Sequence, residues 1–352
     1  MKAMVLAAGL GVRFRPITFA MPKPLVPVCN HPVLAWIIDD LRRQGIDEVV
    51  VNTHHHAGQI EIFLREQYRG NLAIQTTTEA RILGTGGGIA NARGFLDDGA
   101  PFLVVNGDTI QDLPVELMLR VLGESNGLAV MLLREQSESE QYTPVEIERG
   151  RVTRIGGGPA EPRLMFAGFH ALSPEIFEAF PGDEVFDIVA DVYRPILAEG
   201  RIAATVSGPA GWHDLGTAVM YLRACGRLLD EIVSGARRIL DEKSIIHGDS
   251  LVSVSSRIEG EIEMTTVGPS STVGRGSRVL ESVVWAGVTI GSNAWVASSI
   301  ITNGVVVPAR ARIRNAVLIQ RSAGMLVDPS WVAQDNVVAV PLWPDAELLA
   351  EW

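Results

Sequence analysis

Cysteine is scarce in this chain, with only Cys29 and Cys225 among 352 residues. The two have neither the spacing of a zinc site nor that of a redox motif. The simplest interpretation is a protein of the reducing cytoplasm, and we expect that localisation.

Long apolar runs are absent as well. No run reaches the roughly 20 residues that a bilayer-spanning helix needs, so we expect no membrane partner. The apolar stretch Ala3–Ala8 is short for a signal peptide, and the chain after it has the pattern of a strand followed by a loop.

Basic residues are outnumbered, since 30 lysines and arginines face 41 aspartates and glutamates, for a formal net charge of −11. This balance disfavours a nucleic-acid partner, whose phosphates attract a basic surface. A small anionic substrate is compatible with it, because individual lysines and helix N-termini bind phosphate even in an acidic protein.

The composition is otherwise that of a globular protein. Apolar residues make up 47% of the chain and charged residues 20%, which argues against disorder. A length of 352 residues exceeds one ordinary core and predicts two domains.

The first part of the chain alternates short apolar runs with helical patterns, which predicts an α/β fold with a doubly wound, mostly parallel sheet. The expected strands are Lys2–Ala8, Ile46–Asn52, Leu72–Thr78 and Pro101–Asn106, and the expected helices are Val33–Arg43, Gly58–Gln67 and Gly87–Phe95. Ligands of such sheets bind beyond the carboxyl ends of the strands, so the loops after the first and fourth strands are the candidate sites.

After Gly127 the pattern changes and the sheet is expected to become mixed. Val145–Ile155 alternates apolar and polar residues around Arg149-Gly150, as a hairpin does. A further strand is expected at Leu164–Leu172, and helices at Asp187–Ala198 and Ala218–Val233.

From Ile246 onward, apolar residues recur every six positions in four groups of three. They are Ile246, Val252, Ile258, Val267, Val273, Val279, Val284, Ile290, Val296, Ile301, Val307 and Ile313. Such a repeat predicts a parallel β-helix of about four coils that share one apolar axis. We expect an α/β domain over residues 1–233, a linker over 234–245, the hexapeptide β-helix over 246–320 and a C-terminal cap over 321–352.

The loop after the first strand contains Gly9 and Gly11, and a glycine pair there lets backbone N–H groups approach a phosphate. A dinucleotide fingerprint requires a third glycine where Phe14 stands, and a Walker A loop requires a Gly-Lys-Ser/Thr ending that does not follow. Alternatively, the glycines only turn the chain and Arg13 and Lys23 are solvated charges. That alternative explains neither a glycine pair after a strand nor a lysine framed by prolines.

LAAGLGVRFRPIT over residues 6–18, together with PKPLVPV over residues 22–28, resembles the signature of the sugar-1-phosphate nucleotidyltransferases. The resemblance covers nearly the whole chain. It implies an enzyme that condenses an NTP with a sugar 1-phosphate, giving a nucleotide sugar and pyrophosphate. It also implies the fold of nucleotide-diphospho-sugar transferases followed by a left-handed β-helix. The residues it assigns in this region are the nucleotide contacts Leu6, Ala8, Gly9 and Gly11 and the catalytic Arg13 and Lys23.

Two aspartates match the metal-binding positions of this family. Asp108 ends the Asn106-Gly107-Asp108 segment, and Asp214 lies in the segment WHDLGT over residues 212–217. Two carboxylates on one hard cation suit Mg²⁺, although Asp108 alone would equally fit a turn or helix cap. The resemblance gives Asp108 a catalytic role as well, and assigns sugar-phosphate contacts to Asn106, Gly168 and Asp214.

Glu79 and the segment LGTGGG over residues 83–88 resemble the family's nucleobase and ribose segment. This resemblance adds Glu79, Gly84, Thr85 and Gly86 to the nucleotide contacts. The alternative is a plain turn before a helix. FAGF over residues 166–169 resembles the strand that cradles the sugar.

Two departures from the family bear on the identity of the sugar. The Glu-Lys-Pro that often precedes the sugar-cradling strand is missing here, which leaves Arg154 or Arg163 to replace the lysine, and Tyr142-Thr143 stands where many members have Tyr-Gly. TGGGI and the missing lysine are most similar to MurNAc-1-phosphate uridylyltransferases and heptose-1-phosphate guanylyltransferases. The hexapeptide tail is more similar to mannose-1-phosphate guanylyltransferases, and we expect that activity, with GTP, ahead of the other two.

Three further interpretations stay open. The chain could be a non-catalytic regulatory subunit, but Arg13, Lys23 and both aspartates are present. The β-helix could transfer acyl groups, but its only histidine is His247, so we expect it to serve homo-oligomerisation instead. His54–His56 could suggest a metal site, but consecutive side chains diverge, which favours a loop.

Overall fold

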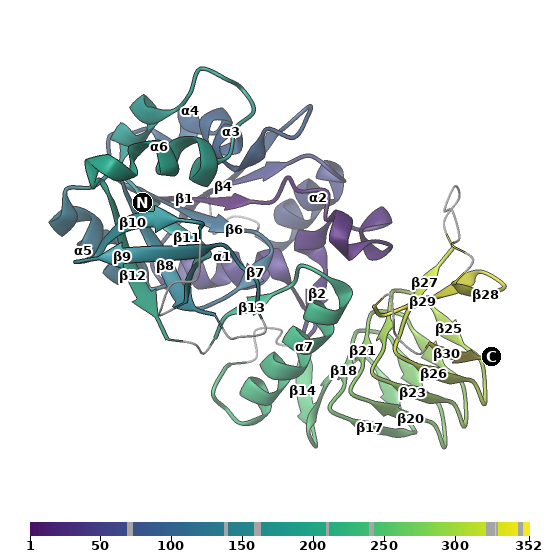
Figure 1. Ribbon diagram of the computed structural model, residues 1–352. Coiled ribbons are helices and arrows are strands. Elements are labelled where there is room, and N and C mark those ends of the chain that lie inside the picture. The colour runs from purple at the N-terminus through teal and green to yellow at the C-terminus, as the bar shows by residue number, and fades with distance from the viewer. Residues whose placement is uncertain are drawn as a thin grey trace. The chain divides into compact units, whose positions relative to one another are not determined.

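The computed structural model describes residues 1–68, 73–136, 140–157, 163–208, 211–238, 243–321, 328, 330–343 and 348–352 (Figure 1). Its contacts divide the chain into two compact units. The first unit comprises Met1–Leu10, Pro22–Pro24 and Val33–His213, and the second comprises Gly11–Met21, Leu25–Pro32 and Asp214–Trp352. The domain bounds expected from the sequence stay a prediction.

A nine-stranded mixed sheet forms the centre of the first unit, in the order β5-β4-β1-β6-β11-β8-β12-β10-β9. The strands are β1 (Lys2–Leu6), β4 (Glu48–Thr53), β5 (Ala73–Thr78), β6 (Phe102–Asn106), β8 (Ala129–Glu135), β9 (Pro144–Glu148), β10 (Arg151–Ile155), β11 (Leu164–Leu172) and β12 (Ile202–Ser207). β5, β4, β1 and β6 are parallel, whereas β11 runs antiparallel to both β6 and β8. The predicted α/β class and the mixed sheet are therefore confirmed.

The predicted hairpin is present as β9 and β10, and its turn lies at the two residues expected. Arg149 and Gly150 have φ angles of 48° and 76°. Positive φ at both central residues is the geometry of the turn that matches the twist of paired strands.

The helices of the first unit include α1 (Val33–Arg43), α2 (Ala57–Gln67), α3 (Gly84–Asn91), α4 (Arg93–Leu96) and α5 (Val115–Ser125), and shorter turns are η3 (Lys23–Leu25) and η4 (Pro174–Ala179). α1 and α2 lie where the sequence places them, whereas α5 was not expected from the sequence. The helix expected at Gly87–Phe95 begins earlier, at Gly84, and is interrupted at Ala92. Leu72, the first residue of the expected third strand, lies outside the described residues.

The helix expected at Asp187–Ala198 is instead three short segments. A π-helix, η5 (Ile188–Tyr193), is followed by a single α-turn, α6 (Arg194–Ile196), and a 3₁₀ turn, η6 (Leu197–Glu199). Asp187 caps η5 by accepting hydrogen bonds from the backbone N–H groups of Val189 and Ala190 at 2.9 and 2.8 Å. Pro195 has no N–H to donate, which is one physical reason for the interruption.

The second unit contains the predicted parallel β-helix, whose strands stack as successive rungs in Figure 1. One sheet holds β15 (Ser250–Ser253), β18 (Thr266–Val267), β21 (Val283–Val284), β24 (Ile300–Ile301) and β27 (Ala316–Gln320). A second holds β16 (Arg257–Ile258), β19 (Thr272–Val273), β22 (Thr289–Ile290) and β25 (Val306–Val307). The third holds β17 (Glu261–Glu263), β20 (Arg278–Leu280), β23 (Trp295–Ala297) and β26 (Arg312–Arg314).

The coil length follows from the strand register. Val267 pairs with Val284 and Val284 with Ile301, a step of 17 residues that corresponds to two steps of six and one of five. Most inward apolar positions of these coils are buried and form one cluster, against which the partly buried Ile258 and Ile262 pack.

One predicted coil position is wrong. Ile246 is 44% exposed and lies in β14 (Ser244–His247), which runs antiparallel to β15 and is not part of a coil. At the other end, β29 (Val337–Pro341) and β30 (Leu349–Glu351) pair antiparallel with β27 and β26, and β28 (Val332–Gln334) pairs with β29.

Helix α7 (Ala218–Val233) is the long helix of the second unit, with the predicted bounds. Its Tyr221 hydroxyl accepts a hydrogen bond from Trp285 Nε1 at 2.9 Å and donates one to the carbonyl of Pro27. The remaining short elements of the chain are η1 (Val12–Phe14), η2 (Ile17–Phe19), β2 (Pro27–Val28), β3 (His31–Pro32), β7 (Thr109–Ile110) and β13 (His213–Asp214). No helix of the described residues has both the length and the apolar character to cross a membrane.

Candidate active site

Three loops at the carboxyl ends of β1, β4 and β5 are tied together by buried Asn52. Its side chain accepts a hydrogen bond from Ala7 N at 2.7 Å and donates one to Glu79 Oε1 at 2.7 Å. The other carboxylate oxygen of Glu79 accepts from Leu83 N at 3.0 Å. Glu79 therefore sets the spacing of these loops, and its role as a nucleotide contact stays a prediction.

The glycine-rich start of α3 lies against the backbone that leads into η5. A Cβ on Gly84, whose φ is +77°, would come 2.5 Å from the carbonyl oxygen of Phe186. The N–H groups of Gly86 and Gly87 donate to that same oxygen at 3.0 and 3.1 Å. These glycines are thus required by close packing of the chain on itself.

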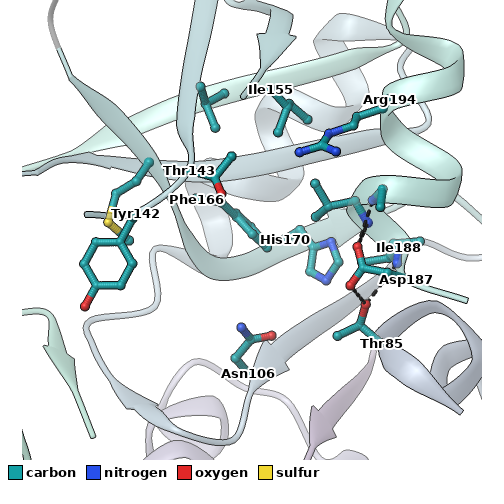
Figure 2. A pocket seen from close by; sticks show the side chains of 14 residues that line it. Thr85, Asn106, Tyr142, Thr143, Ile155, Phe166, His170, Asp187, Ile188 and Arg194 are labelled. Carbon is teal, nitrogen blue, oxygen red and sulfur yellow. Dashed lines mark hydrogen bonds between the residues drawn. The ribbon is translucent and has the colours of Figure 1, made fainter. Parts of the chain in front are cut away.

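Thr85 strengthens this connection through its side chain. Its hydroxyl donates to Asp187 Oδ2 at 2.8 Å and accepts from Ile188 N at 2.9 Å, as the dashed lines in Figure 2 indicate. The segment predicted to hold the nucleotide is therefore directly joined to the element that lines the neighbouring cavity. Nothing in the sequence pattern around Asp187 signals this contact.

Lys23 and Asp108 form an ion pair within the first unit. Lys23 Nζ lies 2.8 Å from Asp108 Oδ2, and the exposed fractions of the two side chains are 10% and 41%. Asp108 follows β6 directly, and the preceding Gly107 donates its N–H to Leu6 O at 2.9 Å, which holds this loop beside the end of β1. The structure thus brings together two of the residues assigned catalytic roles.

Asn106 and Gly168 are also brought together. Gly168 has a φ of +82° in β11, at the place where its pairing with β8 shifts register. A Cβ there would lie 2.9 Å from Asn106 Nδ2, so only glycine leaves the asparagine side chain its position. Both residues were predicted to contact the sugar phosphate.

A cavity of about 350 Å³ opens beside Asn106 (Figure 2). Its polar lining includes Thr85, Asn106, Thr143, His170, Asp187 and Arg194, and its apolar lining includes Val145, Ile155, Met165, Phe166, Ile188 and Val189. A mixed lining of this size suits a small polar molecule with apolar faces.

Arg194 is the cation of this lining, and the sequence did not point to it. Of the two arginines proposed to replace the family's lysine, exposed Arg154 pairs with Glu146, and neither Arg154 nor Arg163 lines the cavity. Gly158 and Pro159, which lie in the stretch that departs from the family, are outside the described residues.

His170 is the buried titratable group of the cavity wall. Its Nδ1 is hydrogen bonded to the Tyr193 hydroxyl. Burial lowers the pKa of His170 to about 3, so the ring is neutral at neutral pH. Burial also raises the pKa of Tyr193 well above its usual value, so the phenol keeps its proton.

Gly11, Arg13 and Asp214 belong to the second unit. Gly11 has a φ of 58°, and its carbonyl accepts from Phe14 N and from the Thr18 hydroxyl, both at 2.9 Å. Arg13 is exposed. Asp214 Oδ1 accepts from Gly216 N at 2.7 Å, which orients the carboxylate. Leu6, Ala8 and Gly9 belong to the first unit, at the end of β1 and in the loop after it.

Asp108 and Asp214 are the carboxylates that bear on metal binding. In the described part of the chain, no cluster of three or more His, Cys, Asp or Glu residues could hold a metal by itself. A carboxylate has about four lone-pair positions. Lys23 Nζ orients the Asp108 carboxylate through Oδ2, and Gly216 N orients that of Asp214 through Oδ1. Carboxylate oxygens are the ligands that a hard cation prefers, so both groups fit such a cation by their chemistry.

The comparisons with known proteins agree with this layout. A family model described as "Nucleotidyl transferase" matches residues 2–231, and one described as "GlmU-like, C-terminal hexapeptide" matches residues 235–319. Together they account for both parts of the chain.

Relatives with assigned names align over most of their length. A probable mannose-1-phosphate guanylyltransferase of Arabidopsis thaliana is 30% identical over 82% of this chain and 82% of its own. The mannose-1-phosphate guanylyltransferase of Mycobacterium tuberculosis is 27% identical over 81% of this chain and 80% of its own length. A UTP–glucose-1-phosphate uridylyltransferase of Synechocystis is 26% identical over 81% of this chain and 83% of its own length.

Solved structures align with part of the chain. HddC from Yersinia pseudotuberculosis, complexed with GMP-PN, aligns with a TM-score of 0.56 and 25% identity over 64% of this chain and 99% of its own. A Bacillus anthracis structure has a TM-score of 0.57 at 22% identity, covers 64% of this chain and 94% of its own, and indicates the same fold.

Proposed function

Because the chain belongs to the nucleotidyl transferase family and is a sugar-1-phosphate nucleotidyltransferase, we propose that it joins GTP to mannose 1-phosphate to give GDP-mannose. The observation that carries this choice is the similarity, over about four fifths of each chain, to relatives named mannose-1-phosphate guanylyltransferase. The GMP-PN complex of HddC supports a guanine nucleotide. MurNAc-1-phosphate uridylyltransferase and heptose-1-phosphate guanylyltransferase are the alternative activities.

The proposed reaction is an in-line displacement at the α-phosphorus of the NTP. An oxygen of the sugar phosphate attacks, the bond to the β-phosphate oxygen breaks, and pyrophosphate leaves with that electron pair. The protein then acts by positioning and by neutralising charge. The nearly buried Lys23 ammonium stabilises charge at the α-phosphate, where its low exposure strengthens the attraction.

Backbone groups and glycines supply the nucleotide contacts in this proposal. Leu6, Ala8 and Gly9 at the end of β1 lie along the nucleotide, and Gly11 and Arg13 bind the β- and γ-phosphates. The α3 loop, with Glu79, Gly84, Thr85 and Gly86, takes the base and ribose through backbone atoms, because the Thr85 and Glu79 side chains are already bonded within the protein. The cavity beside Asn106 and Gly168 takes the sugar.

Asp108 and Asp214 are the proposed holders of Mg²⁺, which when bound neutralises phosphate charge and orients the oxygens of both substrates. Asp108→Asn and Asp214→Asn should each leave the fold intact and lower turnover by orders of magnitude. Full wild-type activity in EDTA would contradict this assignment.

Substrate identity is tested by pyrophosphate release from GTP, UTP, dTTP and ATP against mannose, glucose, MurNAc and heptose 1-phosphates. We expect GTP with mannose 1-phosphate to have the highest kcat/KM. A higher value for UTP with MurNAc 1-phosphate would replace the proposal with that alternative. Absence of activity with every substrate pair would favour a non-catalytic regulatory subunit. The chain argues against that alternative, because it keeps Arg13, Lys23 and both aspartates.

We infer a cytoplasmic enzyme, since both cysteines are free and buried among the described residues. We also infer that the β-helix mediates a homo-oligomer, which light scattering of the full chain tests directly, because a monomeric mass would exclude it.

A further inference from the structure

A buried histidine in the cavity wall has a ring nitrogen without a partner among the residues that the structure describes. His170 is 1% exposed and belongs to the lining of the cavity. Its Nδ1 is bonded to the Tyr193 hydroxyl, whereas Nε2 has no hydrogen-bond partner among the described residues. An unsatisfied buried polar atom is unfavourable, so its presence in a cavity wall points to a group that the cavity receives.

The hydrogen bond to Tyr193 determines which nitrogen carries the proton. A neutral imidazole has one donor and one acceptor nitrogen, and a phenol has one hydrogen to donate. If Tyr193 donates to Nδ1, only the Nε2–H lacks a partner. If Nδ1–H donates instead, both the phenol hydrogen and Nε2 lack partners in the described part of the chain. The first arrangement leaves fewer buried groups unsatisfied, so Nε2 carries the hydrogen and is a donor.

The surroundings hold this donor in place. Phe166 and Tyr193 pack edge-on against the His170 ring, with centroids 5.3 and 5.8 Å away. Figure 2 shows the ring between Phe166 and Asp187. Asp187, the carboxylate of the lining, already accepts from Thr85, Val189 and Ala190.

We propose that His170 is a specificity-determining residue whose Nε2–H donates a hydrogen bond to one oxygen of the sugar, either a ring hydroxyl or the carbonyl oxygen of a substituent. Tyr193 is a positioning residue that sets the tautomer. This assignment rests on the proposed function, in which the cavity holds the sugar 1-phosphate. A sugar that lacks this oxygen leaves the donor unsatisfied, and the site discriminates against it.

The test combines protein variants with deoxy analogues of the preferred sugar 1-phosphate. His170→Leu should raise the KM for the sugar 1-phosphate about tenfold and leave the KM for the NTP within about twofold. His170→Gln, whose side-chain amide can donate from a similar position, should recover part of the loss. Phe177→Leu, a change in the core cluster that also contains Tyr193 but outside the cavity lining, is the control for general destabilisation.

A double-mutant cycle identifies the oxygen. One deoxy analogue should lower the kcat/KM of wild type by the same factor as His170→Leu lowers it on the unmodified sugar 1-phosphate. On that analogue, wild type and His170→Leu should then have equal kcat/KM values. Additive losses at every position of the sugar, or an equal rise in the KM for the NTP, would overturn the proposal even if wild type is fully active. Absence of turnover with every substrate pair would instead overturn the proposed function, and the inference with it.

Tyr193 has an independent readout. Nitrogen NMR of protein labelled at its seven histidines should show His170 protonated on Nε2 in wild type, and a changed or mixed tautomer in Tyr193→Phe. The same variant should raise the KM for the sugar 1-phosphate. An Nδ1-protonated ring in wild type would overturn the tautomer assignment and with it the donor role.

Discussion

At the scale of single residues, Lys23 combines low exposure with a charged partner. Its ammonium lies 2.8 Å from Asp108, and its place between Pro22 and Pro24 restricts the backbone on both sides. A solvated surface lysine would have neither property. Because the partner carboxylate is 41% exposed, losing the pair should cost little stability, so a functional effect can be measured separately.

We predict that Lys23→Ala lowers kcat about a hundredfold, or about 3 kcal/mol, with a much smaller rise in the KM for the NTP. Lys23→Arg should restore activity only in part, because a guanidinium is wide and planar rather than compact. Steady-state kinetics, with circular dichroism as the control for folding, measure both. A kcat for Lys23→Ala within about twofold of wild type would remove the lysine from the mechanism.

His170 predicts a pH dependence of stability. Its pKa of about 3 in the folded protein lies below the value of about 6.5 in an unfolded chain, so the unfolded state takes up a proton first. The contribution of His170 to the free energy of unfolding is therefore complete above about pH 6.5. It decreases as the pH falls toward 3, with a limiting slope of about 1.4 kcal/mol per pH unit.

Urea unfolding at pH 7, 6 and 5 checks this dependence. The decline in the free energy of unfolding with falling pH should be shallower in His170→Leu than in wild type. Parallel curves for the two proteins would show that His170 does not titrate on unfolding.

At the scale of elements, the coils of the β-helix show how a short repeat makes a core. A strand of two or three residues cannot bury its apolar side alone, but stacking places Val273, Ile290 and Val307 in one column. Each inward side chain is packed between the coils on either side of it. The loss of one side chain therefore affects three coils at once.

Ile290→Ala should lower the free energy of unfolding of the coils by about 2–5 kcal/mol, because it leaves a cavity in a fully buried position. Its neighbour Thr289 is exposed and provides the matched control. Thr289→Ala should change stability by no more than about 0.5 kcal/mol. Thermal unfolding of the two variants compares them, and equal midpoints would contradict the inward orientation of Ile290.

The elements that sequence patterns missed have physical reasons in common. β8 is a continuous apolar run, which periodicity alone does not distinguish from a buried helix segment. α3 begins at Gly84 although glycine disfavours helices, because its first N–H groups are bonded to Phe186. In both cases a partner distant in the sequence decides the conformation.

At the scale of the whole molecule, residues far apart in the chain assemble the second unit. Tyr221 of α7 accepts from Trp285 of the β-helix and donates to Pro27, and Phe14 packs against its ring with centroids 5.5 Å apart. Asn30 donates to Ser244 Oγ and to Val267 O, both at 3.0 Å. Early segments of the chain are thus part of the same unit as the β-helix.

Tyr221→Phe should destabilise the protein by about 1–3 kcal/mol, since it removes the partner of the buried Trp285 Nε1 and that of the partly buried Pro27 carbonyl. Tyr68→Phe is the matched control. It also removes one hydroxyl, but the partner, Asp39, is only partly buried and can be hydrated. Denaturant unfolding compares the two, and an equal effect would show that the Tyr221 hydrogen bonds add nothing.

The sequence by itself determined whatever depends on local pattern. Helices α1 and α7, the turn at Arg149-Gly150 and the six-residue step of the coils follow from periodicity and from glycine chemistry, and the motif around Lys23 identified the family. Tertiary structure alone decided the walls of the cavity. Its polar lining comes from separate parts of the chain and includes Thr85, Asn106, His170, Asp187 and Arg194. No short motif contains these residues together, because their proximity arises only when β6, β11 and η5 pack against one another.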